Sequence, residues 1–415
     1  MARTTSLTMA LTSMISLMML VTARSRAQMP CEYDVTIIAA STDCGIFGPV
    51  ITVGLGINEN GAVVGYYYCP LWEHTEAFVW TAEDGFVTLN RPEGVYSASA
   101  VDINDNGVIC GTAWMFDIGQ RGFVYEDGKM IILHPVVPDA GWSSANAINN
   151  AGVVVGQRSI TENLSPQVAY MWSRNDGFVH LDGLEKLSSA TAINGNFITG
   201  WTANTGEMKE GFLWDNGKVT LLGPIPGGFT SEAQSVTNNG IVVGKGRIPL
   251  KGAPVGASRA FVWELGKFTM PGTLPDHARS SASDVSDEEQ QVVGRSWNVD
   301  GVPTIEHGFI WQNGIMHNLN DFIPPESPVL IKSAARITNS GQIIANGDTE
   351  NGEIVAIILT PSPKPLGDLD NDCDVDLDDL VDLLDKWGEK DSPADLNQDG
   401  FVSTIDLLIL FANWT

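Results

Sequence analysis

The most regular feature of the chain is a block of alternating hydrophobic and polar residues that recurs through its middle. The block occurs as "INENGAVVG" (57–65), "INDNGVICG" (103–111), "INNAGVVVG" (148–156), "INGNFITG" (193–200) and "VTNNGIVVG" (236–244), with weaker copies at 285–294 and 337–347. The copies begin at residues 57, 103, 148, 193, 236, 285 and 337, so the period lies between 43 and 52 residues. A period in this range indicates a repeat architecture.

Each copy belongs to a group of four short stretches with the pattern of β-strands. An alternating stretch such as "SASAVD" precedes the Ile-Asn, and the Val-Val-Gly stretch follows it. An aromatic stretch such as "EAFVW" (76–80) and a shorter one such as "GFVTL" complete the group. Branched and aromatic residues that alternate with small or polar ones between Asn and Gly turns are typical of strands. Four strands at this period predict one blade of a propeller.

The two ends of the repeat region predict how the propeller closes. The seventh group ends with "EIVAIIL" (353–359) and has no fourth strand, whereas "YDVTIIA" (33–39) matches the fourth-strand pattern. We therefore predict an all-β, seven-bladed β-propeller over residues 31–360, in which residues 33–39 complete the last blade. Closure of this kind removes an open sheet edge.

The third strands carry a motif that resembles a known repeat family. They read Glu-Ala-Phe, Arg-Gly-Phe, Val-Ala-Tyr, Glu-Gly-Phe, Arg-Ala-Phe and His-Gly-Phe in the first six groups. This series resembles the bacterial extracellular repeats named for a His-Ala-Phe (HAF) strand motif. The resemblance supports the fold, but the family has no characteristic reaction, so it implies no activity.

The polar and aromatic residues of the repeats have structural interpretations. We interpret the recurring Asn-x-x-Gly as a hairpin turn rather than a calcium site, because Asn caps its own backbone and Gly accepts a positive φ. The third-strand aromatics are expected to pack between blades. Trp114, Trp201 and Trp297, just past the second strands, are the exception. If their rings are exposed, they would stack on sugars.

Charge and targeting signals narrow the possible partners. The formal net charge is −27, which argues against nucleic acid or an anionic membrane surface as a partner, since both attract basic faces. A basic start, an apolar run and Ser25-Arg26-Ala27 predict a signal peptide over residues 1–27 and a secreted, extracellular or cell-surface protein with no membrane span after cleavage. An uncleaved anchor is the alternative. Disulfides are then possible among Cys31, Cys44, Cys69, Cys110 and Cys373, and Cys31 with Cys44 is the most local candidate pair.

Sequence motifs for catalysis are absent. There is no Gly-x-Ser-x-Gly elbow, phosphate loop or His-Glu-x-x-His, and the six histidines do not fall at metal-ligand spacings. Carboxylates near turns exist, but none can be paired for glycoside hydrolysis from the sequence. We therefore assign no catalytic residue and no organic cofactor.

After the Pro-rich segment at 361–367 the pattern changes to two copies of an acidic loop, "DLDNDCDVDLDD" (368–379) and "DLNQDGFVSTID" (395–406), each followed by an apolar helical stretch. Numbered as twelve-residue loops, both place oxygen donors at positions one, three, five, seven, nine and twelve, where calcium ligands are expected. Position seven would contribute its backbone carbonyl. The ligands that we predict for two Ca²⁺ ions are Asp368, Asp370, Asp372, Asp374, Asp376 and Asp379 in the first loop, and Asp395, Asn397, Asp399, Phe401, Ser403 and Asp406 in the second.

The first loop departs from the usual pattern at position six, where Cys373 stands in place of the glycine found in the second loop. That position takes a positive φ, which costs a residue with a side chain about 1–2 kcal/mol. Because the donor positions are intact, we expect a strained but working site with Cys373 beside the ion rather than bound to it. Val375 and Val402, at position eight, are expected to join the two loops by a short strand contact.

The paired loops, each with Asp at position twelve and a single following helix, resemble a type I dockerin over residues 368–415. This resemblance implies a small all-α, EF-hand-like domain of loop–helix units that binds a cohesin module, often in polysaccharide catabolism. Dockerins commonly carry a Ser-Thr type pair at positions ten and eleven. Here the recognition positions differ from that pattern, so partner specificity does not carry over. The partner-contacting residues that we predict are Leu377, Asp378, Thr404, Ile405, Leu407, Leu408 and Phe411.

Three functions fit these features. The first is a secreted, non-catalytic propeller that binds a glycan or protein and is tethered by its calcium-dependent dockerin to a cohesin-bearing complex. The second is a carbohydrate-active hydrolase or lyase with its active site on the propeller face. The third makes the C-terminal module a clamp on the propeller, with no partner.

Overall fold

The computed structural model describes residues 29–40, 50–69, 74–133, 141–159, 167–184, 187–203, 208–250, 253–298, 305–370 and 372–415. The predicted signal peptide lies outside the described residues, as do Cys44 and His134. Within the described ranges, no helix has the length and apolar character that a membrane span requires.

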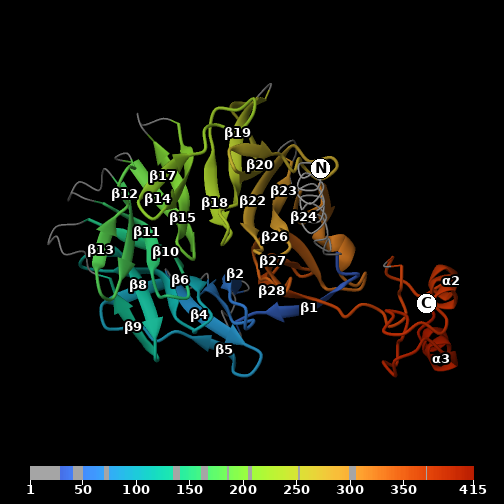
Figure 1. Ribbon diagram of the computed structural model, residues 1–415. Helices are drawn as coiled ribbons and strands as arrows, with labels where there is room; N and C mark the ends of the chain where they lie inside the picture. The colour runs from blue at the N-terminus through green and yellow to red at the C-terminus, as the bar shows by residue number, and fades with distance from the viewer. Residues whose placement is uncertain are drawn as a thin grey trace, which may run out of the picture.

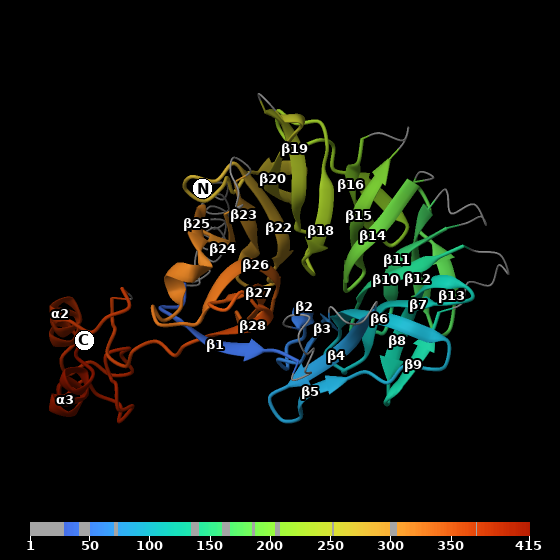
Figure 2. The ribbon, with the colours of Figure 1, turned by 180° about the vertical axis from the view of Figure 1, so that it is seen from behind.

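Seven four-stranded antiparallel sheets are arranged around a common centre (Figures 1 and 2), which confirms the predicted seven-bladed propeller. Blades 1 to 3 consist of β2 (Ile51–Ile57), β3 (Val63–Tyr68), β4 (Thr75–Thr81), β5 (Gly85–Thr88); β6 (Val95–Ile103), β7 (Ile109–Met115), β8 (Gly119–Glu126), β9 (Lys129–Ile132); and β10 (Ser143–Ile148), β11 (Val154–Ser159), β12 (Gln167–Ser173), β13 (Gly177–His180).

Blades 4 to 6 consist of β14 (Leu187–Asn194), β15 (Phe197–Ala203), β16 (Glu210–Asp215), β17 (Lys218–Leu221); β18 (Glu232–Val236), β19 (Val242–Leu250), β20 (Ala253–Glu264), β21 (Lys267–Thr269); and β22 (Arg279–Val285), β23 (Val292–Trp297), β24 (Glu306–Gln312), β25 (Ile315–Asn318). A short 3-10 helix, η2 (Leu319–Phe322), leads to blade 7. Blade 7 contains β26 (Val329–Ile337), β27 (Ile343–Thr349), β28 (Ile354–Pro361) and the N-terminal strand β1 (Tyr33–Ile38).

Strand β1 closes the propeller as the sequence predicts. It pairs with β28 in an antiparallel register that runs from Tyr33 opposite Pro361 to Ile38 opposite Ala356. Tyr33 is fully buried and packs in the same apolar cluster as Ile357 and Leu359. The outer edge of the last blade is therefore filled by the other end of the chain.

The last glycine of each Val-Val-Gly stretch has a steric role that the sequence did not reveal. In blades 1 to 6 the innermost strand has a β-bulge and this glycine lies opposite it, as Gly156 lies opposite Ala145 in blade 3. Blade 7 has Ala345 in this place, opposite Ala334. A Cβ on Gly156 would lie 2.0 Å from the carbonyl oxygen of Ser144, well inside van der Waals contact. The backbone around the bulge of blade 3 therefore leaves no room for a side chain at this position of the second strand.

The aromatic residues of the third strands form the packing between blades, as expected. The Phe or Tyr of each HAF-like motif is fully buried: Phe78, Phe123, Tyr170, Phe212, Phe261 and Phe309. Phe78 of blade 1, for example, packs in one cluster with Ile344 and Ala356 of blade 7. Each blade thus buries its aromatic ring against its neighbour.

The Asn-x-x-Gly motifs form hairpin turns that also link the blades. The side-chain oxygen of Asn58 accepts the backbone N–H of Ala62 at 2.9 Å, and its amide nitrogen donates to the Asn104 carbonyl at 2.9 Å. Asn104 donates in the same way to the Asn149 carbonyl at 3.0 Å, and Asn149 to the carbonyl of Gly195 at 3.0 Å. The motif is therefore a turn whose side chain bonds the next blade around the centre.

The C-terminal module contains α2 (Leu377–Asp385) and α3 (Thr404–Ala412) and lies beside the propeller, next to β1 and β28 (Figures 1 and 2). Its small core comprises five buried residues, Val375, Leu383, Ala394, Val402 and Leu410, with leucines from both loops and both helices packed against them. Both halves of the module therefore share one core.

Candidate metal centre in the C-terminal module

The two acidic loops end at the two helices, and the helix starts fix the last ligand positions. Asp376, at position nine, is the N-cap of α2 and accepts the backbone N–H of Asp378 at 2.8 Å. Ser403 is the N-cap of α3 in the same way. Position twelve is the third residue of each helix, so a capping box orients the side chains at positions nine and twelve in both loops.

The two loops have the same internal hydrogen bonds. The backbone N–H of position six donates to the position-one carboxylate, from Cys373 to Asp368 at 3.2 Å and from Gly400 to Asp395 at 2.7 Å. The buried Asp at position twelve accepts the backbone N–H groups of positions three and nine in both loops. This correspondence means that the two loops share one backbone conformation.

The acidic side chains of the first loop gather in two groups of three. Oxygens of Asp368, Asp370 and Asp372 lie within 4.8 Å of one another, and so do oxygens of Asp374, Asp376 and Asp379. In the second loop, Asn397 and Asp399 approach each other, with the Asn397 amide nitrogen 2.9 Å from an Asp399 oxygen. Asp395, Phe401, Ser403 and Asp406 occupy the equivalent places along that loop. Hard carboxylate and carbonyl oxygens in this arrangement suit Ca²⁺.

The crowding of carboxylates affects their acidity. Desolvation and the charges of neighbouring aspartates raise the pKa of Asp370 and of Asp374. Burial also acts to raise the pKa of Asp379, but hydrogen bonds from backbone N–H groups outweigh it and the pKa is lowered. The pKa of Asp406 is lowered in the same way. A cation would offset the repulsion at positions three and seven, whereas position twelve is already held as a carboxylate.

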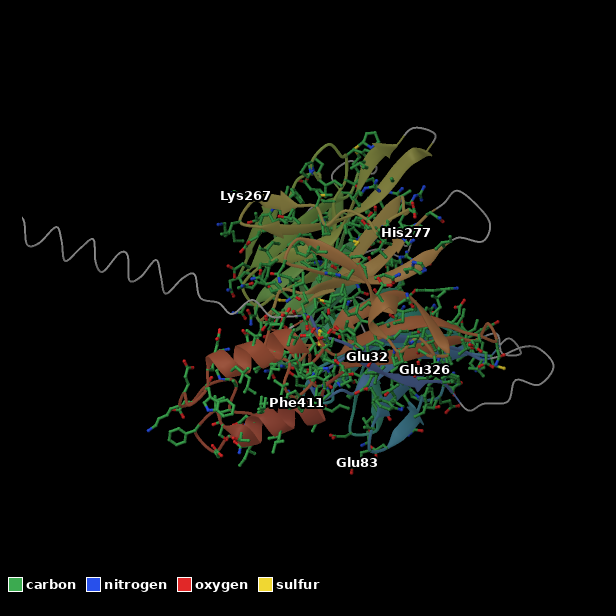
Figure 3. All side chains as sticks on the ribbon, turned by 90° about the vertical axis from the view of Figure 1, so that its right-hand side faces the viewer. Glu32, Glu83, Lys267, His277, Glu326 and Phe411 are labelled. Atoms are coloured by element: carbon green, nitrogen blue, oxygen red, sulfur yellow. A yellow bond between two sulfur atoms is a disulfide. The ribbon has the colours of Figure 1, made fainter. Side chains whose placement is uncertain are left out.

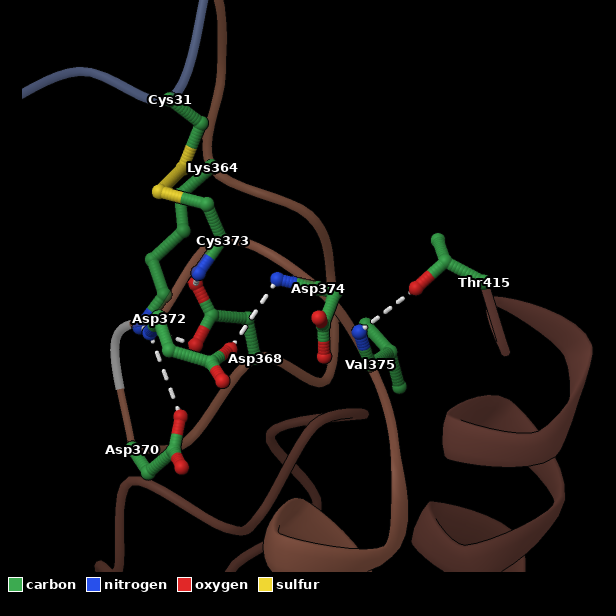
Figure 4. Close-up of a disulfide and its surroundings, with 9 residues drawn as sticks. All are labelled: Cys31, Lys364, Asp368, Asp370, Asp372, Cys373, Asp374, Val375 and Thr415. Atoms are coloured by element: carbon green, nitrogen blue, oxygen red, sulfur yellow. Dashed lines mark hydrogen bonds and ion pairs between the residues drawn. A yellow bond between two sulfur atoms is a disulfide. The ribbon is translucent and has the colours of Figure 1, made fainter.

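Cys373 adopts the backbone conformation expected of position six, with a φ of 83°, and Gly400 has a φ of 99°. The prediction that position six requires a positive φ is therefore confirmed. The partner of Cys31, for which Cys44 was the most local candidate in the sequence, is Cys373, and the two Cα atoms of this disulfide lie 5.3 Å apart (Figure 4). The side chain at position six thus ties the first loop to the propeller.

The long-range disulfide follows from how the propeller closes. The pairing of β1 with β28 brings the N-terminal segment beside the start of the module, and the Ser362 N–H extends this pairing by donating to the Glu32 carbonyl at 2.9 Å. Proximity in space rather than in sequence therefore selects the partner of Cys31. Cys69 is also disulfide-bonded. Cys110 is free and buried, consistent with the odd cysteine count.

The expected strand contact between Val375 and Val402 is not formed. Val402 instead exchanges backbone hydrogen bonds with Gly388 and Glu389. The carbonyl of Val375 accepts the Thr415 N–H at 3.2 Å, and the Val375 N–H donates to the Thr415 hydroxyl at 2.9 Å (Figure 4). Each loop therefore pairs with the segment that follows the other loop's helix. The side chains of both valines still meet in the shared core.

Most of the predicted partner-contacting residues lie on the surface. Leu377 is 62% exposed, Leu408 63% and Phe411 49%. Asp378, Thr404 and Ile405 are exposed as well, but Leu407 is half-buried and packs against the module core. Further large apolar side chains surround them on the same two helices and the segments after them: Val381, Leu384, Trp387 and Trp414.

On the propeller, the mouth of the central channel forms a cavity of about 670 Å³ where the hairpin turns meet. Its carboxylates serve the fold: Glu59 accepts the backbone N–H of Asn339, Asp105 that of Glu59, and Asp287 that of Asn238. Burial first, and then the charges of Asp105 and Asp287, raise the pKa of Glu59. These groups link blades to one another.

The tryptophans considered for sugar stacking are largely covered. The Lys209 ammonium lies 4.1 Å from the ring centre of Trp201, and the Arg295 guanidinium lies 4.8 Å from that of Trp297. Trp114 is half-buried. Cations therefore already occupy the ring faces of Trp201 and Trp297.

Some histidines that are far apart in the sequence lie together in the structure. Three of the six histidines of the chain, His277, His307 and His317, line a single cavity at one edge of blade 6. His277 lies just before β22, His307 on β24 and His317 on β25, so the spacing along the chain does not indicate that they meet.

Comparisons with known proteins identify no family. No protein-family model matches the chain, and no curated protein does. Among solved structures, it is similar to the β-propeller domain of the Trilobed protease from Pyrococcus furiosus, with a TM-score of 0.47 and 9% identity over 75% of this chain and 96% of that one. It is also similar to virginiamycin B lyase from Staphylococcus aureus, with a TM-score of 0.48 and 10% identity over 79% of this chain and 99% of that one. These likenesses carry no argument about activity.

Proposed function

We propose that this protein is a secreted, non-catalytic β-propeller that a calcium-dependent, dockerin-like C-terminal module tethers to a cohesin-bearing extracellular or cell-surface complex, within polysaccharide degradation. The observation that carries the proposal is the matched geometry of the two acidic loops. Both make the same backbone hydrogen bonds from position six to one and from positions three and nine to twelve. A solvated acidic tail would not reproduce these bonds twice.

Calcium binding follows from the donor set. Each loop offers carboxylate or amide oxygens at positions one, three and five, a backbone carbonyl at seven and a carboxylate at twelve. This number and type of donors match the six to eight oxygens that Ca²⁺ takes. The negative charge of the first loop favours a cation further, since its carboxylates raise one another's pKa.

Docking is proposed for the apolar surface formed by α2 and α3. Leu377, Leu408 and Phe411 are about half exposed or more. Apolar side chains that remain exposed on two short helices are typical of a protein interface.

The propeller supplies a binding surface rather than an active site in this proposal. The carboxylates at the channel mouth accept backbone hydrogen bonds from neighbouring blades, and no free carboxylate pair is present there among the described residues. The cavity at the channel mouth, lined by Asn58, Asn104 and Asn149, is the place we assign to a glycan or protein ligand. Because the amides of these three asparagines are already hydrogen-bonded within and between blades, a ligand there would meet the exposed side chains of the lining, among them Asn196 and Asn216.

Calcium titration of the full-length protein tests the metal part of the proposal. We expect two ions per chain, and we expect Asp368→Asn and Asp395→Asn each to remove one of them. Asp385→Asn serves as the matched control, because Asp385 is acidic and exposed but lies at the end of α2, outside both loops. Equal binding in all three variants, or no saturable binding by the wild type, would refute the metal assignment.

A panel of immobilised cohesins, assayed with Ca²⁺ and with EDTA, tests the docking part. We expect capture only with Ca²⁺ and loss of capture in Leu408→Asp. Ile315→Asp is the control, because Ile315 is similarly exposed but lies on the propeller. Turnover of any polysaccharide by the propeller would instead favour the carbohydrate-active enzyme.

A further inference from the structure

The first acidic loop contacts a lysine of the Pro-rich segment that precedes it. The Lys364 ammonium lies 3.6 Å from Oδ1 of Asp368, the carboxylate at position one. The Asp368 side chain has no exposed surface, whereas 40% of the Lys364 side chain is exposed. Figure 4 shows the Lys364 side chain running past the disulfide toward Asp368. The chain therefore brings a cation of its own to one of the predicted calcium ligands.

The backbone on both sides of Lys364 is restrained. Pro363 and Pro365 flank it, and proline fixes its own φ at about −65°. Before them the chain leaves β28, which is paired with β1. After them the Asp368 N–H donates to the Pro365 carbonyl at 3.2 Å, which closes a tight turn. The lysine is thus presented to the loop by a fixed segment of the chain.

The second loop uses the equivalent oxygen differently. Oδ1 of Asp395, at position one, accepts the backbone N–H of Asp399 at 3.2 Å. Asp391 stands four residues before Asp395, at the place that Lys364 has in the first loop. Among the residues that the structure describes, no Lys or Arg forms an ion pair with Asp395. The two loops therefore share a backbone conformation but differ in the cation at position one.

The charge of Lys364 also reaches the last position of the first loop. Burial acts to raise the pKa of Asp379, whereas backbone N–H groups and then the Lys364 ammonium lower it. Oxygens of Asp368, Asp370 and Asp372 lie within 4.8 Å of one another, so an ammonium beside one of them offsets part of their mutual repulsion. Lys364 therefore acts as a counter-ion for the first loop.

A calcium ion in this loop would compete with Lys364 for the same oxygen. Oδ2 of Asp368 accepts the Cys373 N–H at 3.2 Å, which leaves Oδ1 for a cation. Calcium lies about 2.3–2.6 Å from its oxygen ligands, so on Oδ1 it would come within about 6 Å of the ammonium and repel it. Because the lysine side chain is partly exposed, it can rotate into solvent without a change in the backbone.

We propose that Lys364 sets the calcium affinity of the first loop by holding the carboxylate at position one until Ca²⁺ displaces it. This inference rests on the calcium site proposed above for the same loop. Removal of the ammonium should then tighten calcium binding by the first loop. A partly exposed ion pair contributes little, so the gain in affinity is about fivefold.

Calcium titration of the full-length protein by calorimetry, in an Asp395→Asn background that removes the second site, tests the inference. We expect Lys364→Met to bind Ca²⁺ about fivefold more tightly, and Lys364→Arg to bind it as the parent does. Lys386→Met is the matched control with unchanged affinity, because it removes the same charge from the same module but lies at the C-cap of α2. Far-UV circular dichroism verifies that each variant is folded, and Lys364→Gln replaces Lys364→Met if it is not.

Amine-reactive labelling of the wild type with mass spectrometry gives a readout that does not depend on affinity. Lys364 should react faster with Ca²⁺ than with EDTA, because displacement exposes its amine. Lys267 is the reference, since it is exposed on β21 and lies apart from the module that carries Phe411 (Figure 3). Its labelling rate should not change.

Two kinds of result would overturn the inference, and they can be told apart. Equal or weaker calcium binding in Lys364→Met, or a labelling rate of Lys364 that Ca²⁺ does not change, would overturn it and leave the calcium assignment intact. Absence of calcium binding in the Asp395→Asn background would overturn the assignment of the first loop and this inference together.

Discussion

The Cys31–Cys373 disulfide should stabilise the C-terminal module more than any other single bond in it. In a fully unfolded chain the bond closes a loop with a sequence separation of 342 residues, for which chain entropy predicts about 6 kcal/mol. While the propeller stays folded, however, Tyr33 is paired with Pro361. The loop that the disulfide closes then runs only from Cys31 to Tyr33 and from Pro361 to Cys373, about 14 residues in all, which corresponds to about 3 kcal/mol.

The double variant Cys31→Ser/Cys373→Ser removes the bond and leaves no free thiol at either position. We expect the free energy of local unfolding to fall by about 3 kcal/mol for α2 and α3, while the amides of blade 3 keep their protection. Native-state hydrogen exchange with mass spectrometry, at constant Ca²⁺, measures both regions in one experiment.

A second variant, Cys31→Ser/Cys373→Gly, separates the bond from the backbone strain. Residue 373 has a φ of 83°, so glycine should recover about 1–2 kcal/mol relative to serine. Unchanged protection of both helices in the serine variant would show that other contacts hold the module. Equal protection in the serine and glycine variants would refute the strain argument.

Three further predictions concern the metal, the channel and the bulges. Removal of Ca²⁺ with EDTA should increase hydrogen exchange in α2 and α3 but not in blade 3. If α2 and α3 exchange at the same rate with and without EDTA, calcium binding is contradicted. Burial raises the pKa of Asp102 to about 6, so its contribution to stability is present below pH 4 and is lost as the pH rises through 6. In Asp102→Asn the free energy of unfolding should therefore change less between pH 4 and pH 7 than in the wild type, by at most about 3 kcal/mol. Urea unfolding at several pH values measures this difference, and parallel pH profiles for the two proteins would contradict the prediction. Gly156→Ala should cost about 3 kcal/mol, because its Cβ would meet the Ser144 carbonyl at 2.0 Å. Gly152→Asn is the control, since no atom lies within 4 Å of its added Cβ. An equal loss of unfolding free energy in Gly156→Ala and Gly152→Asn would refute the steric reason.

The blades could be predicted from the sequence because their pattern is repeated. The same order of strand patterns occurs seven times, so a strand that is ambiguous in one copy can be assigned from the other copies. The third strand of the last copy, at 353–359, has no following strand in the sequence, which pointed to its partner at 33–39. The reason for Gly156 could not be predicted in this way. It depends on a bulge in the neighbouring strand, which is a property of backbone register rather than of residue type.

The two acidic loops could be recognised in the sequence because the oxygen donors of a calcium loop stand at fixed positions within twelve residues. The features that were missed all depend on contacts between distant segments. Cys31 meets Cys373 only after β1 has paired with β28, and His277 meets His307 only when blade 6 is folded. Val375 pairs with Thr415 instead of Val402, and this pairing joins the first loop to the segment after α3, which position numbers within one loop do not specify.

The disulfide also determines how the molecule would bear a mechanical load. A pull on α2 or α3 reaches β1 through Cys373 and Cys31, and it reaches β28 through residues 361–367. The first residue of β1 lies opposite the last residue of β28, Tyr33 beside Pro361, so both strands are drawn from the same end. Force applied in this way moves the two strands together and does not peel one from the other. Tension on a docked molecule would therefore spare the seam that closes the propeller, whereas a reduced molecule would carry the same tension on β28 alone and unzip it.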